Sequence, residues 1–199
     1  MKKILLTLAI GLITVGALHA QGGNVAAFSY SMGFGTGDMG DFISKPSFRG
    51  FNFDYRRMVT ANIGVGTSIG WDVFYEELPK GTYTLGNESL TGKQFRYSNN
   101  VPMLASISYY LKPGETLSPF FGLGIGTMYT RRNTDMNLYT IEQEAWNFLL
   151  QPEVGLLYSL GNGAALFASA KYNQGFAAGS ELTESQSYFT LNIGFAFHN

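Results

Sequence analysis

Two residues of opposite charge, Glu153 and Lys171, are equidistant from Asn162 in a short Gly-Asn-Gly segment at residues 161–163. If this segment is a tight turn between antiparallel strands, with Leu160 facing Ala164, the register places Glu153 directly opposite Lys171. Opposite charges at facing positions attract, most strongly where water is excluded. We therefore predict an ion pair inside the protein. It would either help to hold the lumen closed or set the charge of the lumen. One alternative is a structural pair with no transport role, and a second is that both side chains contact trapped water.

Other charged residues have the parity of the same face in their own segments: Asp54, Arg56, Asp72 and Arg96. Catalytic chemistry has few candidates, because the chain has no cysteine and its two histidines are His19 and His198. A Ser-His-acid triad is therefore not expected. Residues 35–40, Gly-Thr-Gly-Asp-Met-Gly, match a dinucleotide-binding pattern but open no βαβ unit, so they are interpreted as a loop. The sequence predicts no catalytic residues, no cofactor and no metal site.

The elements that must position these charges are long alternating strands. From Ile63 to Tyr75 the odd positions are large or β-branched, whereas the even positions up to Asp72 are Gly, Ser or Asp. A period of two indicates a strand with one large-residue face and one small or polar face. Roughly 11 residues at ~3.3 Å each, tilted by ~40°, rise about 28 Å, enough to cross an apolar band of ~25 Å.

The same alternation recurs in eight segments: 26–35, 48–57, 62–75, 95–111, 119–131, 145–160, 164–173 and 188–197. The connections at 58–61, 112–118 and 161–163 are short, and those at 36–47, 76–94, 132–144 and 174–187 are long and polar. An even strand number, with short turns at one end and long loops at the other, is typical of outer-membrane barrels. We predict an all-β fold, an eight-stranded antiparallel up-and-down transmembrane β-barrel, closed because an open edge in lipid is costly.

The first residues have the pattern of an export signal. Lys2 and Lys3 precede an apolar stretch at residues 4–18, and Leu18-His19-Ala20 offers a cleavage site. We expect a signal peptide at residues 1–20 and a barrel domain at residues 21–199. The alternative, a membrane-anchoring helix, is disfavoured because the stretch is short for a span.

Composition favours membrane over water around the barrel. Charged residues make up 14% of the chain and aromatic residues 15%. In a soluble barrel the large apolar face would fill the interior, leaving a sparse exterior of Gly, Ser and Asn. Tyrosines and tryptophans also cluster near segment ends, as in interfacial aromatic girdles. Thirteen basic residues, Lys2 and Lys3 among them, against 14 acidic ones give no basic footprint for nucleic acid.

Several motifs resemble the small eight-stranded outer-membrane barrel family that includes the OmpA barrel, OmpX and OmpW. Residues 101–110 followed by 118–126 resemble that superfamily's central hairpin, and residues 151–155 and the C-terminal aromatic alternation are similar too. The family normally ends in phenylalanine, whereas here His198 and Asn199 follow Phe197. The resemblance covers essentially the whole chain after the predicted signal, and its motifs are architectural.

These observations predict an integral protein of the bacterial outer membrane with a structural or surface-interaction role. Its expected partners are outer-membrane lipid and lipopolysaccharide, and a surface ligand of the long loops. A narrow channel for small or apolar solutes is the main alternative, and a membrane-embedded enzyme is a weaker one. Eight strands enclose a lumen that side chains can fill, which favours packing over a continuous pore. Oligomeric state and ligand identity do not follow from the sequence.

Overall fold

A computed structural model describes residues 23–85, 88–177 and 182–199. The predicted signal peptide, residues 1–20, lies outside the described residues. None of the described residues forms a helix long and apolar enough to cross a membrane.

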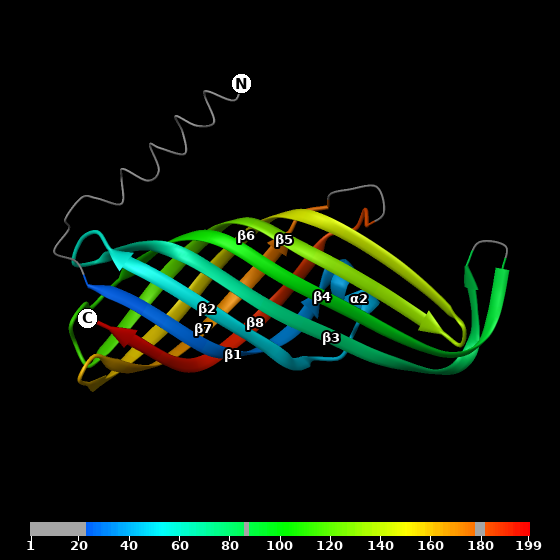
Figure 1. Ribbon diagram of the computed structural model, residues 1–199, viewed down its shortest axis with the longest axis horizontal. Helices are drawn as coiled ribbons and strands as arrows, with labels where there is room; N and C mark the ends of the chain where they lie inside the picture. The colour runs from blue at the N-terminus through cyan, green and yellow to red at the C-terminus, as the bar shows by residue number, and fades with distance from the viewer. Residues whose placement is uncertain (1–22, 86–87, 178–181) are drawn as a thin grey trace, which may run out of the picture.

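Eight antiparallel strands form one closed barrel in sequence order, and the pairing of β1 with β8 closes the ring (Figure 1). Phe28 opposite Phe195 is one pair of this closing ladder. The predicted eight-stranded up-and-down barrel is thereby confirmed. The strands are β1 Asn24–Thr36, β2 Ser47–Met58, β3 Ile63–Leu85, β4 Glu88–Tyr110, β5 Leu117–Met136, β6 Tyr139–Gly161, β7 Ala164–Gly175 and β8 Gln186–His198.

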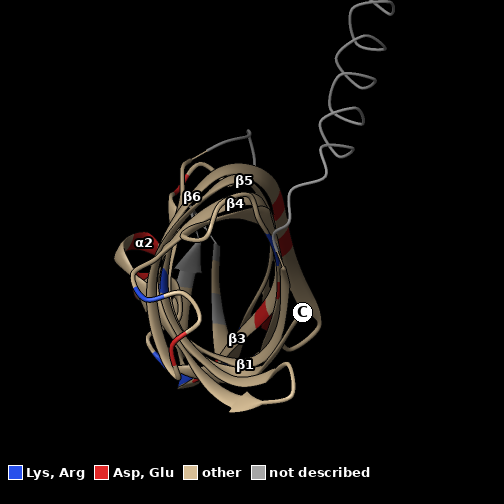
Figure 2. Ribbon diagram, turned by 90° about the vertical axis from the view of Figure 1, so that its left-hand side faces the viewer, with Lys and Arg blue, Asp and Glu red and all other residues tan. Residues whose placement is uncertain are grey.

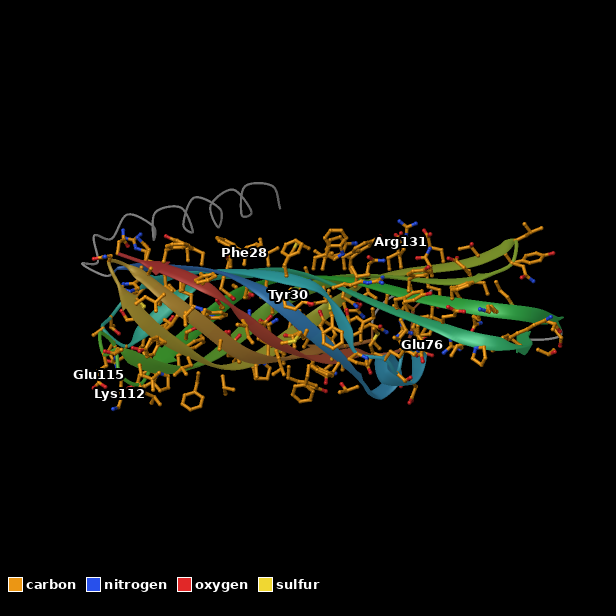
Figure 3. The ribbon with its side chains drawn as sticks, turned by 90° about the horizontal axis from the view of Figure 1, so that it is seen from below. Phe28, Tyr30, Glu76, Lys112, Glu115 and Arg131 are labelled. Atoms are coloured by element: carbon orange, nitrogen blue, oxygen red, sulfur yellow. The ribbon has the colours of Figure 1, made fainter. Side chains whose placement is uncertain are left out.

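The two faces of each strand differ in the way the alternation predicts. Ile69 is 47% exposed on the outside, while its neighbour Ser68 is 1% exposed in the lumen. Because successive side chains of a strand point to opposite faces, the register of a strand determines which of its side chains face the lumen and which face outward. Figure 3 shows rings and aliphatic side chains projecting from the outer wall, with Phe28 and Tyr30 labelled on β1. The outer wall is therefore apolar, and Figure 2 shows few charged segments around the ring.

Tight connections join the strands at the end where Lys112 and Glu115 lie (Figure 3), which we name the short-turn end. Between β6 and β7, Gly161, Asn162 and Gly163 all adopt positive φ. A Cβ added to Gly163 would lie 2.6 Å from the carbonyl oxygen of His198. Glycine therefore serves both the turn and the close approach of β8.

Two of the four expected long loops are mostly strand. The ladder of β3 and β4 continues to Leu85 opposite Glu88, and that of β5 and β6 to Met136 opposite Tyr139. The prediction that residues 76–94 and 132–144 are loops was wrong for most of their length. The alternation of apolar and polar residues weakens there, because these parts of the strands lie beyond the barrel wall. The backbone ladder nevertheless continues. The four strands project beyond the other end, the long-loop end, as one sheet (Figure 1).

The first long connection carries a short helix, α2 Gly37–Phe42, beside the long-loop end of the barrel (Figure 1). Met39 on this helix and Ile43 after it are fully buried. They pack with lumen side chains of the wall, among them Phe74 and Leu149. The connection is thus folded over the mouth rather than extended into solvent.

Candidate functional site

Four charged side chains meet inside the barrel, which we name the charged layer: Asp54, Arg56, Glu153 and Lys171. All four are at most 6% exposed. They come from β2, β6 and β7, so the contacts cross the lumen as well as following the wall. Two positive and two negative charges balance the layer. Pairing with an opposite charge is what makes a buried charge tolerable in an interior.

The shortest ion pairs of the charged layer link β2 to the far wall. Lys171 Nζ lies 2.9 Å from both carboxylate oxygens of Asp54, and Arg56 Nη2 lies 2.7 Å from Glu153 Oε2. Arg56 Nη2 is also 3.5 Å from Asp54 Oδ1. Lys171 further donates to Asn52 Oδ1 and to the Ser68 hydroxyl. The network therefore ties opposite sides of the barrel together.

Glu153 and Lys171 face each other in the register of β6 and β7, at the positions expected from the turn. Lys171 Nζ lies 3.9 Å from Glu153 Oε1, at the outer limit of an ion pair. The closer partners, Asp54 for Lys171 and Arg56 for Glu153, are on β2. The two residues thus belong to a four-membered network rather than to an isolated pair.

An aromatic group lies below the charged layer, toward the short-turn end. The ring centroids of Tyr110 and Phe120 are 5.3 Å apart, and those of Phe120 and Phe167 are 6.0 Å apart. The Arg56 guanidinium carbon lies 4.5 Å from the Phe120 centroid, within cation–π range. All three rings are nearly inaccessible to solvent. They pack together inside the lumen beneath the charges, in one buried apolar cluster.

Asp72 lies above the charged layer. Its carboxylate accepts hydrogen bonds from Ser31 Oγ at 2.7 Å and from the Tyr188 hydroxyl at 3.2 Å. The Tyr188 ring packs edge-on against Phe74, with centroids 5.3 Å apart. Met128 lies against the same hydroxyl. This layer separates the charges from the helix at the mouth.

Two arginines hold α2 over the mouth. Arg96 Nη1 donates to the carbonyl oxygen of Phe42 at 2.8 Å, and the guanidinium of Arg132 lies 4.4 Å from the Phe42 ring centroid. Arg96 is half-buried at the mouth and does not reach the charged layer. At the start of the helix, hydrogen bonds from the Ser185 hydroxyl and backbone N–H hold the pKa of Asp38 below its ordinary value.

The projecting sheet presents a second kind of surface. Strand β7 joins β6 only from Leu149, opposite Gly175. The backbone N–H of Phe176 still donates to the Phe148 carbonyl oxygen, and nearer the tip no strand of the described residues pairs with β6 on that side. We name this side of β6 its open edge. Apolar side chains are exposed along this part of the hairpin: Leu138 97%, Tyr139 67%, Ile141 42% and Trp146 59%.

Sequence reasoning missed the contacts that several inward residues make in the lumen. Asn52 and Ser68 have inward parity and follow from the register across the 58–61 turn, because Ser68 pairs with Asp54. Tyr188 has the parity of β8's inner face, but its contact with Asp72 crosses the lumen. The contact of Arg132 with Phe42 of α2 depends on how the first connection folds. No strand register predicts the fold of that connection from the sequence.

No protein-family model matches the chain, and no curated protein matches it significantly. Solved structures share its fold. The attachment invasion locus protein Ail of Yersinia pestis has a TM-score of 0.53 at 15% identity, covering 89% of this chain and 99% of Ail. The outer membrane protein OprG of Pseudomonas aeruginosa has a TM-score of 0.56 at 15% identity, covering 91% and 97%.

The outer membrane protease OmpT of Escherichia coli also matches, with a TM-score of 0.53 at 6% identity, covering 91% of this chain and 98% of OmpT. These similarities concern the fold, which in OmpT belongs to an enzyme. They confirm the predicted barrel and its resemblance in fold to small outer-membrane barrels.

Proposed function

We propose that this protein, an outer-membrane β-barrel with the fold of the small OmpA, OmpX and OmpW-like barrels, is a surface-binding protein with a sealed lumen. After removal of residues 1–20, its long-loop end faces the cell exterior. Strand β6 then captures an extended polypeptide segment of a partner along its open edge. The observation that carries this proposal is a sheet that extends beyond the barrel and exposes apolar side chains on β6, where no described strand continues the pairing with β7.

The open edge of β6 is suited to strand addition. A partner strand would add main-chain hydrogen bonds to the sheet and place alternate side chains beside Tyr139 and Ile141. The other edge, on β3, is blunted by a register shift between Leu78 and Gly81, with Pro79 and Lys80 inside it. Bulges, proline and lysine are devices that discourage pairing at an edge. The contrast between the two edges favours β6 as the binding strand.

A polypeptide fits this edge better than a sulfated ligand. A solved complex of Ail holds the heparin analogue sucrose octasulfate. Here Arg131, a cation on the outer face of β5, is paired with Glu142 and Glu144 of β6. Two carboxylates against one guanidinium leave this part of β6 unattractive to polyanions.

The lumen supports the binding role over the channel alternative. Aromatic, charged and apolar layers and α2 stand one above another along its axis, and many of their side chains are fully buried. An ion would have to break the charged layer to pass. Catalysis is not part of the proposal, because His198 is the one histidine in the described ranges and lies at the short-turn end.

Peptide binding tests the proposal. Peptides selected from a random library on the protein in phospholipid nanodiscs will bind wild type and lose about tenfold or more in affinity to Tyr139→Lys/Ile141→Lys. The matched control, Tyr83→Lys/Thr82→Lys on β3, will bind them like wild type. Amide exchange at the tip of β6 will slow when peptide binds. A selection that yields no peptide dependent on Tyr139 and Ile141 would contradict the proposal.

A further inference from the structure

A hollow on the outer wall lies where β3, β4 and β5 leave the apolar band toward the long-loop end. Its volume is about 430 Å³. Arg131, near its upper part, is on the outer side of the wall (Figure 3). The residues lining it all have outward parity: Trp71, Tyr97, Asn99, Val101, Tyr129, Arg131, Asn133 and Asp135. None of them points into the lumen, and three of them contact outward side chains of β6: Arg131 and Asn133 bind Glu142, and Tyr129 packs against Trp146.

The lining combines aromatic faces with uncharged hydrogen-bonding groups. Asn99 faces Arg131 and Tyr97 faces Asn133 in the ladder of β4 and β5, so rings and amides alternate around the hollow. Tyr129 packs against Trp146, with centroids 5.2 Å apart, which steadies the ring. Aromatic faces carry negative charge density that favours C–H groups, and amides donate and accept hydrogen bonds. That pairing suits a ligand with hydroxyl groups and C–H faces, as in a sugar.

Charge argues against a phosphate as the main contact. Arg131 is held by Glu142 at one nitrogen and lies 3.7 Å from Glu144 at another. Asn133 Nδ2 also donates to Glu142, at 3.1 Å. Asp135 adds a further carboxylate to the lining. An anion would meet more negative than positive charge, whereas a neutral saccharide meets donors and acceptors of both kinds.

The position of the hollow selects a membrane lipid over a soluble sugar. Val101 marks its lower end. Two residues further along β4, Met103 pairs with Ile69 of β3 and Ala105 then pairs with Ile125 of β5, and both isoleucines are exposed apolar side chains. A ligand seated there can place its headgroup on Trp71 and its acyl chains on the apolar wall. We propose that the hollow binds the saccharide headgroup of an outer-leaflet glycolipid. This inference rests on the orientation in the proposed function, which puts the hollow at the outer leaflet.

Trp71 provides the reporter for the test. Trp71 and Trp146 are the two tryptophans of the chain, so Trp146→Phe leaves Trp71 as the sole indole. In phosphatidylcholine nanodiscs, purified lipopolysaccharide will shift Trp71 emission saturably, and so will its enzymatically dephosphorylated form. The deacylated, soluble saccharide will bind more weakly. Asn99→Ala/Asn133→Ala will weaken glycolipid binding about tenfold or more, because two hydrogen-bonding groups are lost.

A matched control exists on the opposite wall, where Tyr172 of β7 donates a hydrogen bond to Gln174. Tyr172→Leu/Gln174→Ala removes an aromatic–amide pair outside the hollow and will leave binding unchanged. Binding that disappears on dephosphorylation would overturn the saccharide assignment, as would equal affinity of the asparagine variant or no binding at all. Peptide capture is tested at Tyr139 and Ile141, which do not line the hollow, so the two proposals fail separately.

Discussion

Lys171→Ala will destabilise the folded barrel by about 3–5 kcal/mol, because it leaves Asp54 buried without its closest cation. Lys171 is fully buried, and its ammonium lies 2.9 Å from both oxygens of that carboxylate. Removing one member of a buried pair strands the other charge, which costs more than the pair itself contributes. Reversible urea unfolding of the protein in lipid vesicles will measure the loss.

Double-mutant cycles will locate the strongest couplings in the charged layer. Coupling should be large for Lys171 with Asp54 and for Arg56 with Glu153, and smaller for Lys171 with Glu153, whose charged atoms are 3.9 Å apart. Lys112→Ala is the control, because Lys112 and Glu115 form an exposed pair at the short-turn end. A Lys171→Ala variant as stable as Lys112→Ala would refute the structural role of the layer.

Ile69→Arg will destabilise the barrel by about 2–4 kcal/mol if residue 69 lies near the bilayer midplane. Ile69 is exposed on the outer face of β3, where a guanidinium would have to enter hydrocarbon. Ile69→Leu is the matched control and keeps the apolar surface. The same vesicle unfolding assay applies. An Ile69→Arg variant within error of Ile69→Leu would mean that this face does not contact lipid.

Ser68→Ala on the inner face marks a limit of parity reasoning. Alternation assigns Ser68 to the lumen. From the sequence alone, replacing such a small inward residue with alanine is expected to cost little stability. The structure gives it two partners, because its hydroxyl donates to Asn52 and accepts from Lys171. The loss of these hydrogen bonds should cost about 1 kcal/mol.

The sequence predicted the barrel well because lipid and lumen impose opposite demands on alternate residues of every strand. It also placed Glu153 opposite Lys171, since a tight turn sets the register of the two strands it joins. It did not predict that Asp54 and Arg56 would be their closest partners. Contacts across the lumen depend on how eight strands close, and no single turn fixes that geometry.

The projecting sheet escaped prediction for a different reason. Residues 76–85 and 139–144 continue β3 and β6 beyond the barrel, where the strands are no longer part of the barrel wall. Without one apolar face the period-two signal weakens, although backbone pairing persists. Arg96 was assigned to the lumen by parity alone, yet it lies at the mouth and holds Phe42 of α2. The parity of a residue predicts which face of the strand it lies on. It does not predict where along the barrel axis a neighbouring loop folds over that face.

Planar-bilayer recording of the refolded protein tests the central claim, a sealed barrel that binds at the cell surface, most directly. The charged layer and the buried rings of Tyr110, Phe120 and Phe167 lie across the lumen. Because an ion would have to displace them, bilayers containing correctly folded protein should show no stable unitary currents. Circular dichroism and the heat-modified gel mobility of the same sample will establish that the barrel is folded. Stable, reproducible unitary currents from that sample would contradict the sealed lumen and restore the narrow channel as its function.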